Sequence, residues 1–317
     1  MAVTLAQAKL NVQTDLEMGV IDEFRKSSYL LDNMTFHDAV SPVGGGATLT
    51  YGYTRILTQP TANFRAINSE YTPQEVTKQP YSVDLKVFGG SYQVDRIVND
   101  LGGIVSEVQL QSSQKIKAAT ALFHDTVING DSGVNANAFD GIDKAVTGSS
   151  TEYNASGTEI DLSTSATMDT NWKVFLDALD EFLSGLDGIP VLLGNTKLIT
   201  KIKSLARRAG SLSQMDMFGG KVDSYNGSAL IDLGQKPGSN SPIVSIDGTT
   251  GNTSLYAGRL GLDGLHGVSL KGQSPVKTFL PDFSTPGAVK TGEVEMVAAI
   301  ALKASKAAGV FRKLKVQ

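Results

Sequence analysis

The chain has 317 residues, and its 28 lysines and arginines against 32 aspartates and glutamates give a formal net charge of −4. It has no cysteine, which excludes a disulfide framework, a thiolate zinc site, an iron–sulfur cluster and a cysteine nucleophile. The slightly acidic balance argues against a dedicated nucleic-acid-binding protein, which would show a basic excess. A hydrophobic share of 41% with 19% charged residues is typical of a globular chain.

The sequence shows no sign of export or membrane insertion. No run approaches the ~18 apolar residues of a membrane span. The N-terminus lacks the basic lead and apolar stretch of a signal peptide. Together with the absence of cysteine, this predicts synthesis in the cytoplasm without export. His37, His124 and His266 are too scattered in the sequence to predict a metal site, and the 33 glycines predict many turns and loops.

Residues 4–31 are predicted to form an N-terminal helical arm. Apolar residues recur there at spacings of three and four, as on one face of a helix: Leu5, Ala8, Val12, Leu16, Val20 and Phe24. Gly19 interrupts this stripe and weakens the helix. The pattern is compatible both with an ordinary amphipathic surface helix and with an arm that packs on a neighbouring subunit.

Two segments with strict alternation of side chains, residues 48–54 and 81–87, are predicted to be strands with one buried face. Between them, residues 58–80 are polar and interrupted by proline. The two strands are therefore expected to pair as one long hairpin with an elaborate tip. Because an isolated two-stranded ribbon is only marginally stable in water, another surface must cover it, and a neighbouring subunit is the economical candidate.

The rest of the chain predicts a mixture of helices and strands. A long helix is expected over residues 103–128, followed by a turn-rich loop at 129–142. Residues 169–186 carry the strongest helical pattern, and a buried strand at 189–194 separates them from another helix that ends at Gly210. The glycine-rich remainder predicts further short strands, and together these elements indicate a mixed α and β architecture.

Three local motifs suggest chemistry but lack the residues that the chemistry requires. Ser132 lies in a Gly-Asp-Ser-Gly stretch typical of a serine nucleophile, yet the pattern places no histidine base beside it. Residues 131–142 match a calcium loop only in part, since Ala136 and Ile142 replace the required glycine and glutamate. The glycines at 44–46 lack the lysine of a phosphate-binding loop. We therefore predict no catalytic residue, no cofactor and no metal site.

The order of these features resembles the major capsid proteins of tailed phages, which have the Hong Kong 97-type fold. Residues 62–100 resemble the extended loop of that family and the first strands after it, and residues 103–128 resemble its long spine helix. The stretch INGDSGVNANAFDGI at 128–142 is similar to the loop that follows the spine helix. VDSYNGSALIDLG at 222–234 is similar to a stretch of the axial domain. The resemblance covers essentially the whole chain.

This resemblance implies an α+β fold with four parts. Residues 1–45 would form an N-terminal arm, and residues 46–92 an extended loop built on a long β-hairpin. Residues 93–145 together with 285–317 would form a peripheral domain that contains the spine helix. Residues 146–284 would form an axial domain that surrounds the centre of a ring of subunits.

The resemblance also implies a function as the major capsid (head) protein of a tailed bacteriophage, a structural subunit and not an enzyme. Such subunits assemble with one another through hexamers and pentamers into an icosahedral shell that encloses double-stranded DNA non-specifically. The partners expected besides the subunit itself are scaffolding, portal and decoration proteins, with no membrane. The expected location is the virion capsid, after assembly in the cytoplasm of the host bacterium.

Two other interpretations remain open. An encapsulin-type nanocompartment shell shares the fold but packages enzymes. A protein of another class is the second alternative, either a surface adhesin or a hydrolase that uses Ser132 as its nucleophile. The missing export signal counts against the adhesin.

Four charged residues of the extended loop form the candidate site. Arg65, Glu70, Glu75 and Lys78 are predicted to make intersubunit ion pairs that set the register between neighbouring subunits. In some members of the family a lysine of this loop forms an isopeptide bond with an asparagine of another subunit, and Lys78 lies in the corresponding region. No feature of the sequence shows that Lys78 reacts, and an ordinary surface lysine accounts for it.

Overall fold

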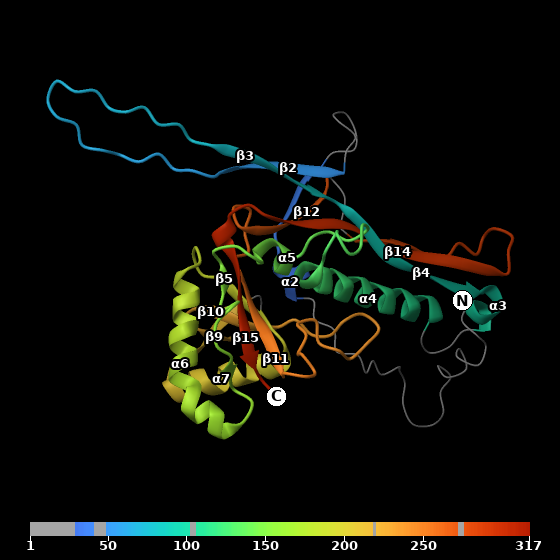
Figure 1. The fold of residues 1–317 in the computed structure, drawn as a ribbon. Helices are drawn as coiled ribbons and strands as arrows, with labels where there is room; N and C mark the ends of the chain where they lie inside the picture. The colour runs from blue at the N-terminus through green and yellow to red at the C-terminus, as the bar shows by residue number, and fades with distance from the viewer. Residues whose placement is uncertain (1–28, 41–48, 102–105, 218–219, 272–275) are drawn as a thin grey trace.

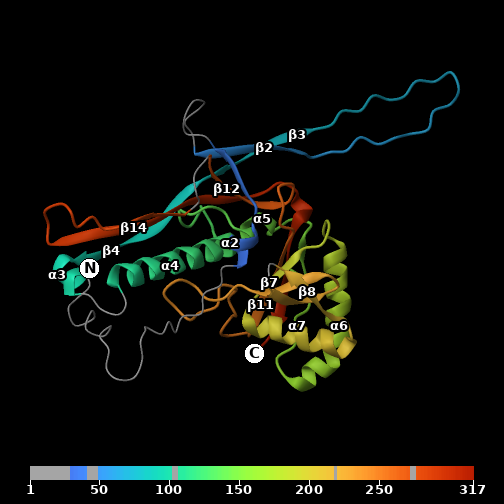
Figure 2. The same ribbon diagram turned by 180° about the vertical axis from the view of Figure 1, so that it is seen from behind.

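A computed structural model of the protein describes residues 29–40, 49–101, 106–217, 220–271 and 276–317. Figure 1 shows three connected parts: a long hairpin that projects from one side, a sheet with a long helix beneath it, and a second sheet flanked by two helices. The hairpin extends well beyond the rest of the ribbon, and the view from behind in Figure 2 shows the same arrangement.

The sheet above the long helix contains five strands within the described residues. They are β1 (Phe36–Val40), β4 (Lys86–Asp95), β12 (Leu265–Leu270), β13 (Val276–Phe279) and β14 (Val289–Leu302). β14 is antiparallel to β12, β13 and β4, and its ladder with β4 runs from the pair Val289↔Asp95 to the pair Ala298↔Lys86. β1 joins the sheet parallel to β12. β14 therefore connects the other strands of this sheet.

The long helix α4 (Glu107–Asn129) packs against β4 and β14. Phe123 on its inner face is completely buried, and its ring centroid lies 6.0–6.3 Å from those of Phe36, Phe88 and Phe139. Such aromatic contacts join the helix to the sheet and to the loop that follows the helix. The helix predicted over residues 103–128 is confirmed from Glu107 onward, and residues 103–105 lie outside the described part. Three short helices complete this region, namely α2 (Tyr29–Asn33), α3 (Arg96–Leu101) and α5 (Ile142–Val146).

The second sheet has eight strands among the described residues, in the order β5-β15-β11-β7-β10-β9-β8, with β6 paired to β15. These strands are β5 (Glu152–Tyr153), β6 (Ile160–Asp161), β7 (Val191–Gly194), β8 (Leu212–Met217), β9 (Gly220–Tyr225), β10 (Ser228–Asp232), β11 (Asn252–Gly258) and β15 (Ala308–Lys315). β7 and β10 are parallel. The neighbouring residues Leu192 and Leu193 belong to two different hydrophobic cores, so β7 is buried on both faces. This explains why the segment predicted as a strand is continuously apolar.

Two amphipathic helices, α6 (Ser165–Ser184) and α7 (Thr196–Ala209), cover one face of the eight-stranded sheet. Thr164 and Thr167 form a reciprocal capping box at the start of α6. The Asn195 side chain accepts the backbone N–H of Leu198 at 2.9 Å at the start of α7. Gly210 ends α7 with a φ of 72°, a conformation that glycine adopts at little cost. Both helices were predicted, with bounds that differ by a few residues.

The strand pairing divides the C-terminal half differently from the predicted boundaries. β12 and β13 lie within residues 146–284, yet they pair with β14 in the five-stranded sheet. β15 lies within residues 285–317, yet it pairs with β11 in the eight-stranded sheet. The chain crosses between the sheets through the short 3-10 helix η1 (Ser305–Ala307). Local patterns show that a segment is a strand but not which distant strand it pairs with. The domain boundaries therefore stay a prediction, and the observed pairing groups these segments by sheet.

The projecting hairpin consists of β2 (Thr50–Ile56) and β3 (Lys78–Asp84), paired in the register from Thr50↔Asp84 to Ile56↔Lys78. The expected long hairpin is therefore confirmed. The predicted second strand, 81–87, covers both the end of β3 and the start of β4, because the chain runs on through the buried Leu85. Of the predicted N-terminal arm, residues 29–31 fall within α2, and residues 4–28 lie outside the described part.

Gly89 is the point of closest approach in the ladder between β4 and β14. A Cβ atom at Gly89 would lie 1.9 Å from the carbonyl oxygen of Val294, whereas one at Gly90 would meet only the flexible side chain of Lys115 at 3.4 Å. We predict that Gly89→Ala lowers the free energy of unfolding by about 3 kcal/mol, because the ladder must move apart. The matched variant Gly90→Ala should be near neutral. Urea denaturation of both variants checks this, and equal stabilities would contradict it.

Candidate functional site

The base of the hairpin is fixed to the end of β14 by Tyr53 and Arg55. The Tyr53 hydroxyl donates to the Leu302 carbonyl at 2.9 Å. The Arg55 Nε donates to the Lys303 carbonyl at 2.9 Å, and its Nη2 also donates to Leu302. The Arg55 guanidinium carbon lies 4.3 Å from the centre of the Tyr81 ring, across the hairpin. One arginine thus bonds two backbone carbonyls of the body and stacks on the hairpin's second strand.

A second contact at the base involves Tyr51, which is only 8% exposed. Its ring lies edge-on to those of His37 and His266, with centroid distances of 5.5 and 5.9 Å. The Tyr51 hydroxyl and the His37 Nδ1 are 3.3 Å apart. The hairpin therefore leaves the body from a packed and hydrogen-bonded base.

The outer part of the hairpin, residues 57–77, lies in solvent apart from the half-buried Val76. Four large apolar side chains are exposed there: Leu57 directly after β2, and three farther out, with exposed fractions of 108% for Phe64, 91% for Ile67 and 60% for Tyr71. The turn that carries the outer three is held locally, because Ser69 donates its backbone N–H to the Ala66 carbonyl at 3.2 Å. A cluster of apolar side chains on an otherwise exposed projection is typical of a surface that binds another protein.

The four candidate residues all lie on this projecting element. Arg65 donates to the Ser69 carbonyl at 3.1 Å, and its guanidinium carbon lies 5.5 Å from the centre of the Tyr71 ring. Glu70, Glu75 and Lys78 are exposed and form no ion pair within the described part of the chain. Arg65 therefore also organises the tip itself.

Sequence reasoning missed Arg55 and the apolar side chains at the tip. The signal for the tip was present, because Phe64, Ile67 and Tyr71 stand alone in a polar, proline-interrupted stretch. Such isolated apolar residues in an expected loop indicate a contact surface. Arg55 gave no signal, since its partners lie almost 250 positions away in the sequence.

Comparison with solved structures shows that the fold of the chain is similar to that of an encapsulin and of phage and GTA particle proteins. It matches a structure of the holo-SrpI encapsulin complex from Synechococcus elongatus with a TM-score of 0.65 and 14% identity, over 100% of this chain and 98% of the other. A structure from Microbacterium phage Oxtober96 matches with a TM-score of 0.59 and 11% identity, over 100% of both chains. The capsid of an empty GTA particle matches with a TM-score of 0.58 and 9% identity, over 98% of both chains.

The chain has the Hong Kong 97-type fold. This confirms the α+β fold that the sequence resemblance implied. No protein-family profile and no curated protein sequence matches the chain. At identities of 9–14%, the fold is carried by the pattern of strand pairing and burial and not by shared residues.

Within the described residues, the basic side chain that reaches Ser132 is Lys144, which is held in ion pairs. Lys144 Nζ lies 3.1 Å from Ser132 Oγ, but it also pairs with Asp131 at 2.7 Å and Asp140 at 2.9 Å. The hydrogen bonds that Lys144 donates to these carboxylates raise its pKa, so it stays protonated and cannot accept the serine proton. His124 is fully buried on α4, where its Nε2 accepts the Leu31 N–H.

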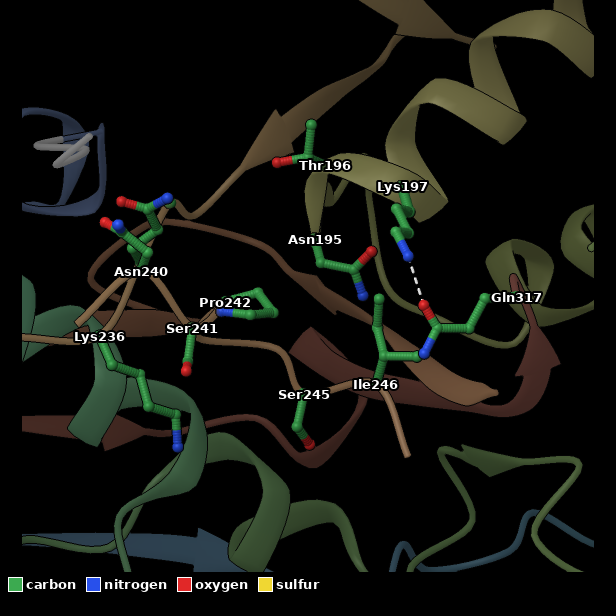
Figure 3. A pocket seen from close by; sticks show the side chains of 12 residues that line it. Asn195, Thr196, Lys197, Lys236, Asn240, Ser241, Pro242, Ser245, Ile246 and Gln317 are labelled. Atoms are coloured by element: carbon green, nitrogen blue, oxygen red, sulfur yellow. Dashed lines mark hydrogen bonds between the residues drawn. The ribbon is translucent and has the colours of Figure 1, made fainter. Parts of the chain in front are cut away.

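A cleft with a volume of about 640 Å³ lies between the start of α7 and residues 234–246. Figure 3 shows Lys197 reaching the side chain of Gln317 at its edge. In its wall, Asn195 Nδ2 donates to Thr253 Oγ1 at 2.7 Å.

The described residues offer neither a metal cluster nor a membrane span. No group of three or more histidine or acidic residues able to hold a metal ion occurs in the described ranges. No helix in the same part of the chain is long and apolar enough to cross a membrane.

Arg55→Ala should loosen the hairpin without unfolding the body. The substitution removes charged hydrogen bonds to two carbonyls, each worth about 1.5–3 kcal/mol. We therefore expect amide hydrogen exchange in β2 and β3 to accelerate at least about tenfold, with little change in the melting temperature. Thr54→Ala is the matched control, because Thr54 is exposed on the same strand. Equal exchange rates in the two variants would contradict the role given to Arg55.

Proposed function

We propose that this chain is the major capsid protein of a tailed bacteriophage, which assembles through hexamers and pentamers into an icosahedral shell around double-stranded DNA. The observation that carries the proposal is the hairpin, which is fixed at its base and exposes apolar side chains at a tip far from the body. The Hong Kong 97-type fold, shared with capsid structures, supports the same function.

The tip has the properties of one half of a subunit contact. Burying each of Phe64, Ile67 and Tyr71 against a neighbour would contribute about 1.5–3 kcal/mol per side chain. The hairpin reaches outward from one side of the subunit, so the surface that receives it belongs to a different patch on the next copy. Contacts between different patches close into rings when the rotation is right, as hexamers and pentamers require.

The charged residues of the hairpin would set the register of that contact. Glu70, Glu75 and Lys78 are exposed and unpaired within the described part of the subunit, which leaves them available for a neighbour. Together with Arg65 they place both signs of charge beside the apolar trio. Charges at the rim of an apolar contact favour one alignment over others.

The proposed parts of the subunit follow the observed pairing. The five-stranded sheet with α4 would be the peripheral domain, and the eight-stranded sheet with α6 and α7 the axial domain. Scaffolding, portal and decoration proteins would be the further partners, and the shell would assemble in the cytoplasm of the host bacterium. The near-neutral charge of the chain fits DNA that is enclosed by the shell and not gripped by each subunit.

An encapsulin-type compartment shell is the second candidate. It is favoured by the match to the encapsulin complex, which has a TM-score of 0.65 over the whole chain. The two candidates share the shell and differ in its contents.

Removing the apolar tip should prevent shell formation while leaving the subunit folded. We predict that Phe64, Ile67 and Tyr71 replaced together by serine give soluble protein with the natural melting temperature, because these side chains pack on nothing in the body. Electron microscopy and sedimentation would then show small species in place of large particles.

The matched control is Val134→Ser, which removes an apolar side chain that is 88% exposed outside the hairpin. It should leave particles intact.

Charge reversals at Glu75 and Lys78 should reduce particle yield when made singly and restore part of it when combined with reversals on the receiving surface. Shells of unchanged yield from the serine variant would overturn the role of the hairpin.

The contents of purified particles distinguish the two candidates. Particles from infected or induced host cells are treated with nuclease, and the protected material is extracted. For a phage capsid we expect nuclease-resistant double-stranded DNA of one length. Particles that hold an enzyme and no protected DNA would favour the encapsulin-type shell and overturn the phage assignment.

A further inference from the structure

A fully buried histidine lies beneath the base of the hairpin. His266 on β12 is 0% exposed. Its ring centroid lies 6.2 Å from that of His37 on β1 and 5.9 Å from that of Tyr51 on β2. These three rings join a strand of the sheet, the strand that precedes the hairpin and the first strand of the hairpin.

The surroundings of His266 oppose a positive charge. Neither of its ring nitrogens has a hydrogen-bond partner among the residues that the structure describes. The backbone carbonyl of Gly264 favours the charged ring, but it already accepts the N–H of Lys303 at 3.0 Å. The groups that face the His266 ring are His37 from β1, Tyr51 from β2 and Lys303 from the turn after β14. Within the described residues, no carboxylate is paired to the His266 ring.

Taken together, these surroundings favour the neutral form of the His266 ring. Burial is the largest cause, followed by the charge of Lys303 and then His37, and together they lower the pKa of His266 from its usual 6.5 to about 4. The ring is therefore neutral whenever the cluster is closed at neutral pH.

The cluster fastens the hairpin to the body through β2, as Tyr53 and Arg55 also do. Tyr51 packs into it with an exposed fraction of 8%. Lys303, whose Nζ lies 5.8 Å from the centre of the Tyr51 ring, also offers its backbone carbonyl to Arg55. A shift of the His266 ring would thus affect both the packing of Tyr51 and the bond from Arg55 to the Lys303 carbonyl, which together hold β2.

We propose that His266, His37 and Tyr51 form an acid-sensitive latch, which holds the hairpin base against the sheet while His266 is neutral and releases it when His266 is protonated. The latch rests on the proposed function only for its consequence, a change of hairpin position within a shell. The device itself lies within one subunit and exists whether or not shells form.

The pH range follows from linkage. A histidine whose pKa is lowered in the closed state stabilises that state fully above pH 6.5, and the stabilisation is lost as the pH falls from 6.5 toward 4. In the released state the exposed ring has its ordinary pKa of about 6.5. The ratio of released to closed hairpin should therefore rise about 25-fold between about pH 7.5 and pH 5.

The absence of cysteine allows a direct measurement on the full chain. Spin labels are placed on Ala62→Cys in the outer hairpin and Lys306→Cys in η1, both of which are exposed positions. Labelled chains are diluted with unlabelled ones, and pulsed electron paramagnetic resonance gives the distance distribution at pH 7.5, 5 and 4. We expect one narrow distribution at pH 7.5 and a growing second population at pH 5 and 4.

His266→Leu should abolish this second population, because the ring nitrogens have no partners to lose and no proton is then taken up. His266→Gln repeats the test with a polar side chain if the leucine variant does not fold, as judged by circular dichroism. His124→Gln is the matched control, a buried histidine at the contact of α2 with α4, and should open as the natural sequence does.

Three outcomes would each overturn the latch. The first is a second distance population of equal size in the His266 variants, and the second is its loss in His124→Gln. The third is a single unchanged distance distribution of the natural sequence down to pH 4. Particle formation at pH 7.5, viewed by electron microscopy in the same preparations, tests the proposed function separately. A chain that opens with acid but forms no particles would retain the latch and lose the shell.

Discussion

The ladder between β4 and β14 is the interaction on which the positions of the other parts depend. Through Leu85, β4 continues directly from the hairpin strand β3, and β14 continues through η1 into β15 of the eight-stranded sheet. The register pairs Lys86 with Ala298, so the ten paired positions between them bring the start of β4 beside the end of β14 and fix the hairpin and the second sheet at the same end of the ladder. Because one hydrophobic core includes residues of both sheets, such as Leu193 and Met296, the two sheets are held together by packing as well as by the chain.

The base of the hairpin is packed and hydrogen-bonded to the body, whereas its tip is exposed to solvent. At the base, Tyr51 and Tyr53 are shielded and Arg55 bonds two carbonyls of the body. At the tip, Phe64 and Ile67 lie in water with no partner among the described residues. A fixed base limits the directions that the tip can sample, so that less conformational freedom is lost when the tip binds a neighbour. In the proposed shell, the contact of the hairpin with its own body would thus prepare the contact with the next copy.

The sequence allowed the elements of this fold to be predicted better than their connections. Period-2 alternation identified the hairpin strands, and the stop at Gly210 identified the end of α7, because both signals are local. The pairing of β15 with β11 involves residues such as Val310 and Tyr256, which are more than fifty positions apart. No local pattern records such a pairing. The same limit hid Arg55 and His266, whose importance arises only when β2, β12 and β14 meet.

In the proposed shell, the tip would have to remain soluble in the free subunit and still bind its neighbour. Exposed apolar side chains on an extended ribbon invite random association. Here Arg65, Glu70 and Glu75 interrupt the apolar positions, and Arg65 holds the turn by its bond to the Ser69 carbonyl. Charges of both signs disfavour contacts that leave them unpaired, so only a neighbour with complementary charges gains the full benefit of apolar burial. The residues that the sequence singled out for register would thus also suppress the wrong contacts that the apolar trio alone would allow.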